Sequence, residues 1–228
     1  LLEVSTVVAS VQRLKPVYDG KLLVDVLSLS VWSMLHAFIS VAPWFLFFVA
    51  VEHLGKTELA ISNITRSVSA VFFVIVNSFA VTTGSLVSNA IGAGERRAVF
   101  IICRKILRLG YSAGFPLIGV AVCYNRLIIG IYTDNELLTE QAFIPFVVTL
   151  LNYTFALPGY VYLNAVGGTG KTRITFLFQV TTTVVYLGYL YWLSACTHAS
   201  LAIYLTAEYL FVILLALQSV FYLRSKQY

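Results

Sequence analysis

Charged side chains are scarce in this sequence of 228 residues. Asp, Glu, Lys and Arg together make up 11% of the chain, hydrophobic residues make up 59%, and the mean hydropathy is +0.87. A soluble domain carries about a quarter of its residues as charged side chains, so this chain has too few to cover a surface that faces water. The composition excludes an ordinary soluble domain and predicts a membrane protein.

Groups that bind metals or perform catalysis are also few. The three cysteines and three histidines are Cys103, Cys123, Cys196, His36, His53 and His198. Neither set has the paired spacing of a zinc site or a disulfide framework, because the members are scattered along the chain. A catalytic triad would also need a carboxylate at membrane depth, and only Glu208 qualifies. The sequence therefore predicts neither a metal site nor an enzyme.

Six long apolar runs dominate the rest of the chain. A bilayer core of ~30 Å requires about 20 apolar residues at the rise of an α-helix. The runs that meet this requirement cover residues 26–51, 59–88, 106–131, 142–166, 174–195 and 201–223. Short alternating strands with turn signals are absent from the sequence, so each run is predicted to be a helix. The predicted fold is an all-α membrane protein, a six-transmembrane-helix bundle over residues 21–228.

The basic residues lie in short clusters between these runs. They form no continuous stripe, which disfavours nucleic acid as a partner despite the net charge of +5. In a six-span arrangement, twelve of the 15 Lys and Arg residues flank one side of the membrane, and only Lys56 and Arg126 flank the other. Basic residues concentrate on the cytoplasmic side of membrane proteins. We therefore expect a multi-pass protein of the cell (inner) membrane with both termini cytoplasmic.

The stretch "AVGGTGKTR" at residues 165–173 matches a loose phosphate-loop pattern. A phosphate loop follows a buried β-strand, and its backbone N–H groups then wrap the phosphates. Here the motif lies between the fourth and fifth predicted helices, and no acidic residue after a buried strand is available to hold Mg²⁺. We interpret the motif as a tight cytoplasmic turn. A membrane-embedded, nucleotide-driven enzyme remains a distant alternative that rests on this motif alone.

Residues 1–12, "LLEVSTVVASVQ", are apolar but too few to cross a bilayer. We expect residues 1–20 to be the tail of a preceding helix followed by a cytoplasmic connector. The sequence is then expected to be a fragment of a longer chain or a natural half of a larger protein.

Three connectors together resemble a known family. These are "VEHLGKTELAISNI" at 51–64, "LVSNAIGAGERRA" at 86–98, and "AVGGTGKTR". Their order and spacing are similar to turns in the second half of the multidrug and toxic compound extrusion (MATE) transporters, and the resemblance covers about residues 20–228. It implies one lobe of a two-lobe transporter with twelve spans, whose missing partner is an N-terminal six-helix lobe.

The resemblance also implies a function. MATE proteins exchange Na⁺ or H⁺ for organic cations, drugs or other amphipathic compounds, so we expect a coupling ion and no other cofactor. Some members carry carboxylates in the first and fourth spans of this lobe, at places that correspond to Ser40 and Ala156, and neither is acidic here. A flippase for lipid-linked saccharides, of the same broad superfamily, is the alternative. Such flippases line their cavity with several basic residues, whereas Arg66 is the only basic residue predicted to lie deep within a span.

Six residues are candidates for binding substrate or ion, because they place polar groups at membrane depth. They are Arg66, Asn77, Asn152, Tyr153, Gln179 and Glu208. Arg66 and Asn77 belong to a stripe on one predicted helical face, with Asn63, Ala70, Gly84 and Ser88. This face can form a cavity wall or contact other helices. Arg66 and Glu208 lie at similar depths and can form an ion pair, or Glu208 can exchange a proton or meet a cation.

Overall fold

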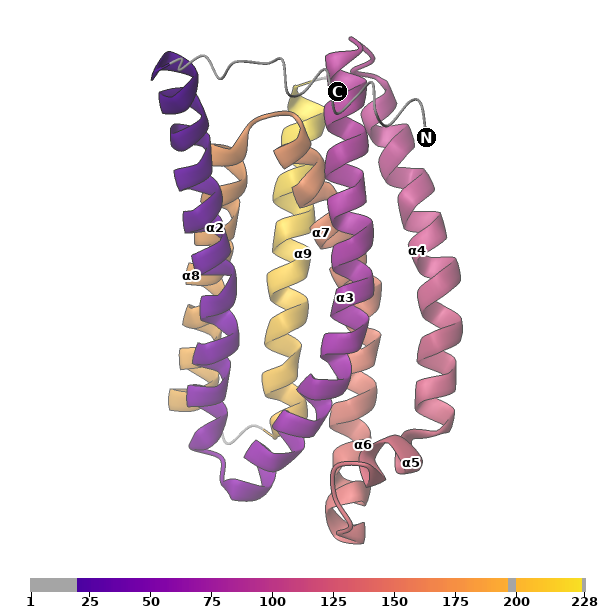
Figure 1. Cartoon of the computed structure of the whole chain (residues 1–228). Helices are drawn as coiled ribbons and strands as arrows, with labels where there is room; N and C mark the ends of the chain where they lie inside the picture. The colour runs from indigo at the N-terminus through magenta and orange to yellow at the C-terminus, as the bar shows by residue number, and fades with distance from the viewer. Residues whose placement is uncertain (1–19, 197–199, 227–228) are drawn as a thin grey trace, which may run out of the picture.

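The computed structural model describes residues 20–196 and 200–226, and these residues form helices joined by short turns without any β-strand. The helices, in chain order, are α2 (Gly20–Glu52), α3 (Lys56–Gly92), α4 (Ala98–Cys123), α5 (Asn125–Gly130), α6 (Glu136–Leu151), α7 (Tyr153–Gly168), α8 (Thr172–Cys196) and α9 (Leu201–Ser225). Apart from the short α5, the long axes of these helices run roughly side by side in one bundle (Figure 1). The all-helical fold predicted from the apolar runs is confirmed.

Five of the predicted spans meet the length and hydropathy of a membrane-crossing helix within the described residues. These are Lys56–Gly92, Ala98–Cys123, Glu136–Gly168, Thr172–Ala195 and Leu201–Ser225. The first predicted span lies in α2, which has 33 residues and packs beside α8 and α3. Its apolar stretch is the shorter Ala37–Glu52, so the sixth span stays a prediction. The helix tail and connector predicted for residues 1–20 fall almost wholly outside the described residues.

The two described ends of the chain lie at the same end of the bundle (Figure 1). The turns between α3 and α4 and between α7 and α8 lie there too. In each turn a glycine has a positive φ, 81° at Gly94 and 79° at Gly170, a conformation that residues with a Cβ rarely adopt. The glycines in these turns are therefore explained by the backbone conformation that the turns require. The "AVGGTGKTR" turn follows a helix, whereas a phosphate loop follows a strand.

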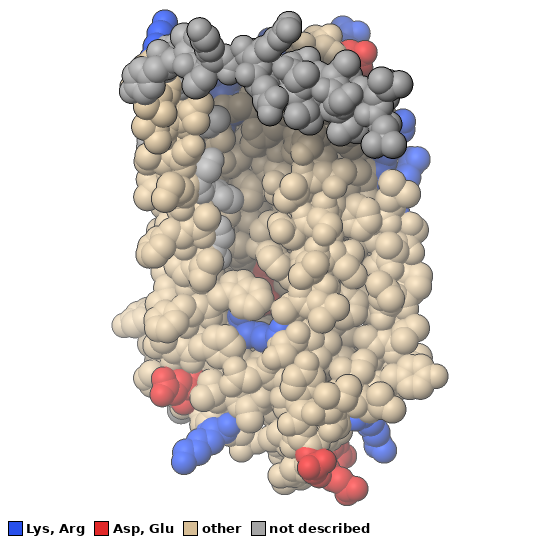
Figure 2. All heavy atoms as spheres, viewed as in Figure 1, with Lys and Arg blue, Asp and Glu red and all other residues tan. Residues whose placement is uncertain are grey.

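Charged side chains gather near the two ends of the molecule, and the middle of the surface is apolar. Figure 2 shows this distribution for one face, on which blue and red atoms near the middle lie inside a hollow. Exposed hydrophobic side chains include Phe38, Leu109 and Val184, which lie near the middle of their helices. Such a surface is stable in contact with lipid tails, because the tails are as apolar as these side chains and exposing the side chains to them has no hydrophobic cost.

Helix α7 is central because it packs most extensively against α3 and α9. Small residues permit this close approach. A Cβ built on Gly159 would lie 2.8 Å from the Val212 carbonyl oxygen of α9, and one on Gly168 would lie 2.5 Å from the Gly84 oxygen of α3. The backbones of α7 and its two neighbours are therefore nearly in contact, and residues of all three helices line one internal cavity.

The fourth predicted span is divided into α6 and α7 by a break at Asn152. Pro158 follows within α7 and lacks the N–H that would bond to the Thr154 carbonyl one turn earlier. The hydroxyl of Tyr111 on α4 donates to that carbonyl oxygen instead, at 2.8 Å. The carbonyl that proline frees is thus satisfied by a neighbouring helix.

Candidate functional site

A cavity of about 80 Å³ lies within the bundle, between α2, α3, α6, α7, α8 and α9. A water molecule needs about 10–15 Å³ by such a measure, so several fit. Aromatic rings form much of the wall: Trp44, Phe72, Phe73, Tyr153, Tyr160, Tyr186 and Phe211. We refer to this space as the aromatic cavity. Its polar wall residues include Arg66, Asn152 and Glu208.

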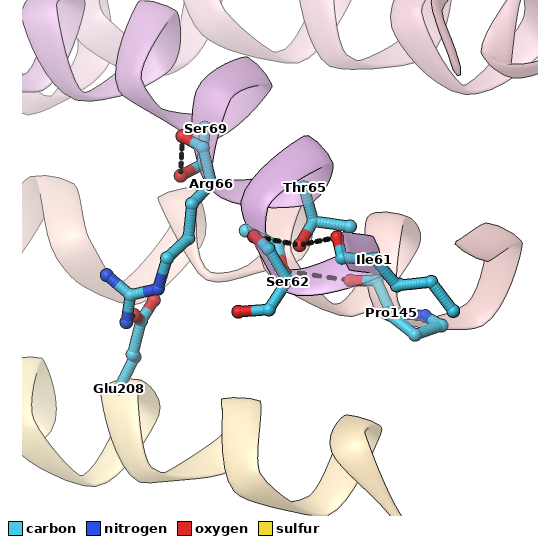
Figure 3. Close-up of polar contacts among 8 residues, drawn as sticks. Ile61, Ser62, Thr65, Arg66, Ser69, Pro145 and Glu208 are labelled. Atoms are coloured by element: carbon cyan, nitrogen blue, oxygen red, sulfur yellow. Dashed lines mark hydrogen bonds and ion pairs between the residues drawn. The ribbon is translucent and has the colours of Figure 1, made fainter. Parts of the chain in front are cut away.

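An ion pair crosses the aromatic cavity from α3 to α9. Nη2 of Arg66 donates to Oε1 of Glu208, and Figure 3 shows the two side chains reaching toward each other from their helices. The Arg66 side chain is 4% exposed and that of Glu208 is 24% exposed. Charges at membrane depth are stable when they are paired. The structure thus forms the pair that the similar depths of these two residues allowed.

The guanidinium of Arg66 is also surrounded by aromatic faces. Its Cζ lies 4.0 Å from the ring centroid of Phe47, 4.9 Å from Trp44 and 5.1 Å from Phe48. These distances fall within the range of cation–π attraction. Nε and Nη1 of Arg66 have no hydrogen-bond partner among the described residues, although they are buried. One carboxylate oxygen, three ring faces and the neighbouring side chain of Tyr186 therefore surround this cation.

The family of the chain follows from comparison with known proteins. The family model of MatE matches residues 33–192. The chain belongs to the MatE family. No curated protein matches the sequence. The family match confirms the resemblance found in the three connectors, which all lie within the matched region.

Solved structures share the fold of this MatE chain. One is a MOP superfamily transporter from Pyrococcus furiosus, described as having a binding pocket of reverse polarity that suggests a different function. Its TM-score against this chain is 0.75, and the two sequences are 16% identical. The match covers 87% of this chain and 44% of the transporter. Another is a point mutant of a MATE protein, with a TM-score of 0.75, 17% identity, and coverage of 87% and 45%. The MatE chain thus spans less than half the length of these transporters.

Four of the six candidate residues of the MatE chain line the aromatic cavity: Arg66, Asn152, Tyr153 and Glu208. Oδ1 of Asn152 is buried without a hydrogen-bond partner among the described residues. The hydroxyl of Tyr153 donates to the Gly110 carbonyl oxygen at 2.7 Å, so this side chain also joins α7 to α4. The four residues come from three parts of the bundle, and only helix packing brings them together.

The other two candidates lie elsewhere. Asn77 is exposed on α3, and Gln179 is buried in α8, where neither end of its amide has a partner among the described residues. The stripe on α3 therefore does not share one environment, since Arg66 is buried while Asn63 and Asn77 are exposed. The expectation of a single continuous face is corrected by the structure. Figure 1 shows the physical reason, because α3 bends near its N-terminal end and so changes its neighbours along its length.

Most of the aromatic wall carries only a weak signal in the sequence. A seven-residue step identifies part of it, since residues seven apart share a helical face. Phe73 follows Arg66 by seven residues, and Tyr160 follows Tyr153 by seven. Ala156 also lines the cavity. Glu208 is then the only carboxylate among the described lining residues.

Proposed function

We propose that this chain is one lobe of an ion-coupled antiporter that exports organic cations, drugs or other amphipathic compounds. The observation that carries the proposal is a partly exposed carboxylate, Glu208, paired with the buried Arg66 in an aromatic cavity. Ligand sites combine apolar walls with a few well-placed polar groups. Ring faces attract cations, and intramembrane ionisable groups mark ion and proton pathways.

The coupling step is proposed to take place at Glu208. This carboxylate can accept a proton or meet Na⁺, and either event would weaken its attraction for Arg66. A change in one ion pair between α3 and α9 would then alter the packing of the lobe as the transporter rocks between its two orientations. Support comes from the position of the pair, since it joins two helices that both contact the central helix α7.

A second lobe is proposed to cover the exposed polar side of α3. The exposed polar residues of this helix include Asn63, Ser67, Asn77, Ser78, Thr82, Ser85, Ser88 and Asn89. Ser67, Ser78 and Thr82 bond to carbonyls of their own helix, but an amide offers more donors and acceptors than one such bond satisfies. Amides in contact with lipid are costly. This side of α3 fits an aqueous cleft or the missing N-terminal lobe, which would make Asn77 part of a wall between lobes.

The alternative functions have less support. A lipid-linked saccharide flippase would be expected to offer several free basic groups, whereas Arg66 is the one basic residue among the described lining residues and it is paired. A nucleotide-driven enzyme rests on "AVGGTGKTR", which forms a turn between α7 and α8. We therefore propose the antiporter.

Replacing Glu208 with Gln in the full-length protein tests this function. The amide keeps the shape of the side chain and removes its charge, so we expect ion-driven transport of a fluorescent organic cation in proteoliposomes to stop. Glu140→Gln is the matched control, because Glu140 is exposed at the start of α6, and it should transport normally. Normal transport by Glu208→Gln would end the proposal. If Glu208→Gln is not expressed and adding Arg66→Gln restores both expression and gradient-driven transport, the pair serves stability alone.

A further inference from the structure

The surroundings of the Arg66 guanidinium have the composition of a binding site for an organic cation. Such sites combine a carboxylate with aromatic faces, which attract positive charge through the ring quadrupole. Here the carboxylate is that of Glu208, and the nearest ring faces belong to Phe47, Trp44 and Phe48. The occupant of this site is a side chain of the protein itself.

The hydrogen-bond donors of the Arg66 guanidinium are only partly satisfied. A guanidinium that binds a carboxylate in the strongest geometry uses two parallel N–H donors. Arg66 bonds to Glu208 through Nη2, while Nε and Nη1 are buried without a partner among the described residues. The ring faces attract the charge but do not satisfy these donors. The guanidinium is therefore retained by fewer hydrogen bonds than its donors can make, which favours exchange with another cation.

Glu208 can be reached from the aromatic cavity. Its side chain is 24% exposed, whereas that of Arg66 is 4% exposed, and both line the cavity. A series of rings in edge contact leads from the guanidinium into this space. Trp44 lies 6.0 Å from Phe73, and Phe73 lies 5.3 Å from Tyr160, between ring centroids. A ligand in the cavity would thus meet a carboxylate and aromatic rings before it met Arg66.

We propose that Arg66 is a tethered occupant of an organic-cation site, and that a small guanidinium or ammonium group of the substrate competes with it for Glu208. The inference rests on the proposed transport function, for which it specifies the substrate class. Binding of the substrate cation releases Arg66 from Glu208, and departure of the substrate lets Arg66 return. The carboxylate is therefore never left without a cation at membrane depth.

Competition predicts that removing Arg66 strengthens the binding of a free cation. The apparent affinity of a site falls in proportion to the fraction of time it is available, and Arg66 occupies this one. We expect the Kd of methylguanidinium, measured by calorimetry on the full-length protein in detergent, to be at least about tenfold lower in Arg66→Gln than in the wild type. Methylurea has a similar shape without the charge, and it should bind to neither.

Two further variants make the test specific. Arg126→Gln removes an exposed basic residue on α5 and should bind methylguanidinium as the wild type does. Arg66→Gln combined with Glu208→Gln removes the carboxylate as well and should lose the gain. Since Arg66→Gln leaves the partly exposed carboxylate of Glu208 without its partner, the melting temperature of this variant is measured with and without the ligand. Methylguanidinium should raise that temperature and methylurea should not.

The outcomes separate this inference from the proposed function. Equal or weaker methylguanidinium binding by Arg66→Gln would overturn the competition, even if the wild type transports organic cations. Stabilisation of Arg66→Gln with no detectable binding to the wild type would overturn it too, because the ligand would then only fill a gap. Tighter binding of an anion, such as acetate, than of methylguanidinium by the wild type would contradict the assigned ligand class. A tenfold gain without any transport would support the cation site and refute the antiporter.

Discussion

A methyl group added to Gly159 tests the packing that holds the site together. The Cβ of an alanine there would lie 2.8 Å from the Val212 carbonyl oxygen and 3.3 Å from the Val212 Cβ. The first of these atoms is backbone, so α7 and α9 must move apart to relieve the contact. Overpacking of this kind costs about 1–3 kcal/mol. A Gly-to-Ala change inside a helix returns up to about 1 kcal/mol through helix propensity.

The expected net loss is about 1–2 kcal/mol of unfolding free energy, which corresponds to a fall in melting temperature of about 2–8 °C for a chain of this size. Transport should fall as well, because Val212 lies one helical turn from Glu208 on α9 and both line the aromatic cavity. The assays are thermal unfolding in detergent and uptake of an organic cation into proteoliposomes, both with the full-length protein.

Gly119→Ala is the matched control. Gly119 lies within α4, and a Cβ there would meet nothing within 4 Å among the described residues. This variant should melt at or slightly above the wild-type temperature, since it gains helix propensity without a clash. If Gly159→Ala melts as high as Gly119→Ala and transports normally, then the backbones of α7 and α9 are not in close contact at Gly159.

Three further predictions follow from the fold. Tyr111→Phe removes the hydroxyl that donates to the Thr154 carbonyl, and it should cost about 1–2 kcal/mol of unfolding free energy. The loss should be smaller in a Pro158→Ala background, where the helical N–H bonds to that carbonyl. Equal losses in both backgrounds would show that the Tyr111 hydroxyl does not replace the missing N–H. Cysteines introduced at Thr169 and Thr133 should be labelled by an impermeant reagent from opposite sides of the membrane, and labelling of both from one side would contradict the topology. This chain expressed alone should confer no drug resistance on cells that lack related pumps, because a transporter cavity lies between two lobes; resistance would show that one lobe suffices.

The positions of the membrane helices could be predicted because hydropathy acts locally. An apolar run of about 20 residues prefers lipid whatever its neighbours are, and inside lipid its backbone must form a helix to satisfy its hydrogen bonds. Five predicted spans are accordingly found as membrane-length helices. The break at Asn152 was less predictable. Pro158 indicated a disturbed helix, but the structure places the break six residues before it.

The glycine-rich turns were predictable for a different reason. Their glycines supply the positive φ that a tight reversal requires, as at Gly94 and Gly170. The sequence "AVGGTGKTR" also matches a nucleotide-binding motif. Only the secondary structure on either side distinguishes a tight turn between helices from a phosphate loop. Both elements are helices, in agreement with the hydropathy on which the sequence interpretation depended.

The site was only partly predictable. Polar residues at membrane depth are rare enough that each one is conspicuous, which is why the sequence alone marks Arg66, Asn152, Tyr153 and Glu208 as candidates. Aromatic residues at the same depth are common and carry no such signal, since they also fill packing gaps and face lipid. Most of the wall of the aromatic cavity was therefore not predicted, including Tyr160 and Trp44, one of the rings beside Arg66.

The sequence by itself determined the solvent of this protein, the helical form of its spans and the places where the chain turns, because each depends on the residues within one segment. Only the tertiary structure decided which side chains meet. Arg66 and Glu208 are 142 positions apart, and the rotation of α3 and α9 about their axes brings them into contact. Asn77 lies about three turns along nearly the same face of α3 but is exposed, because the neighbours of this helix change along its length. Helix rotation is set by close packing against neighbours, as at Gly159 and Val212, and that information is distributed over the whole bundle.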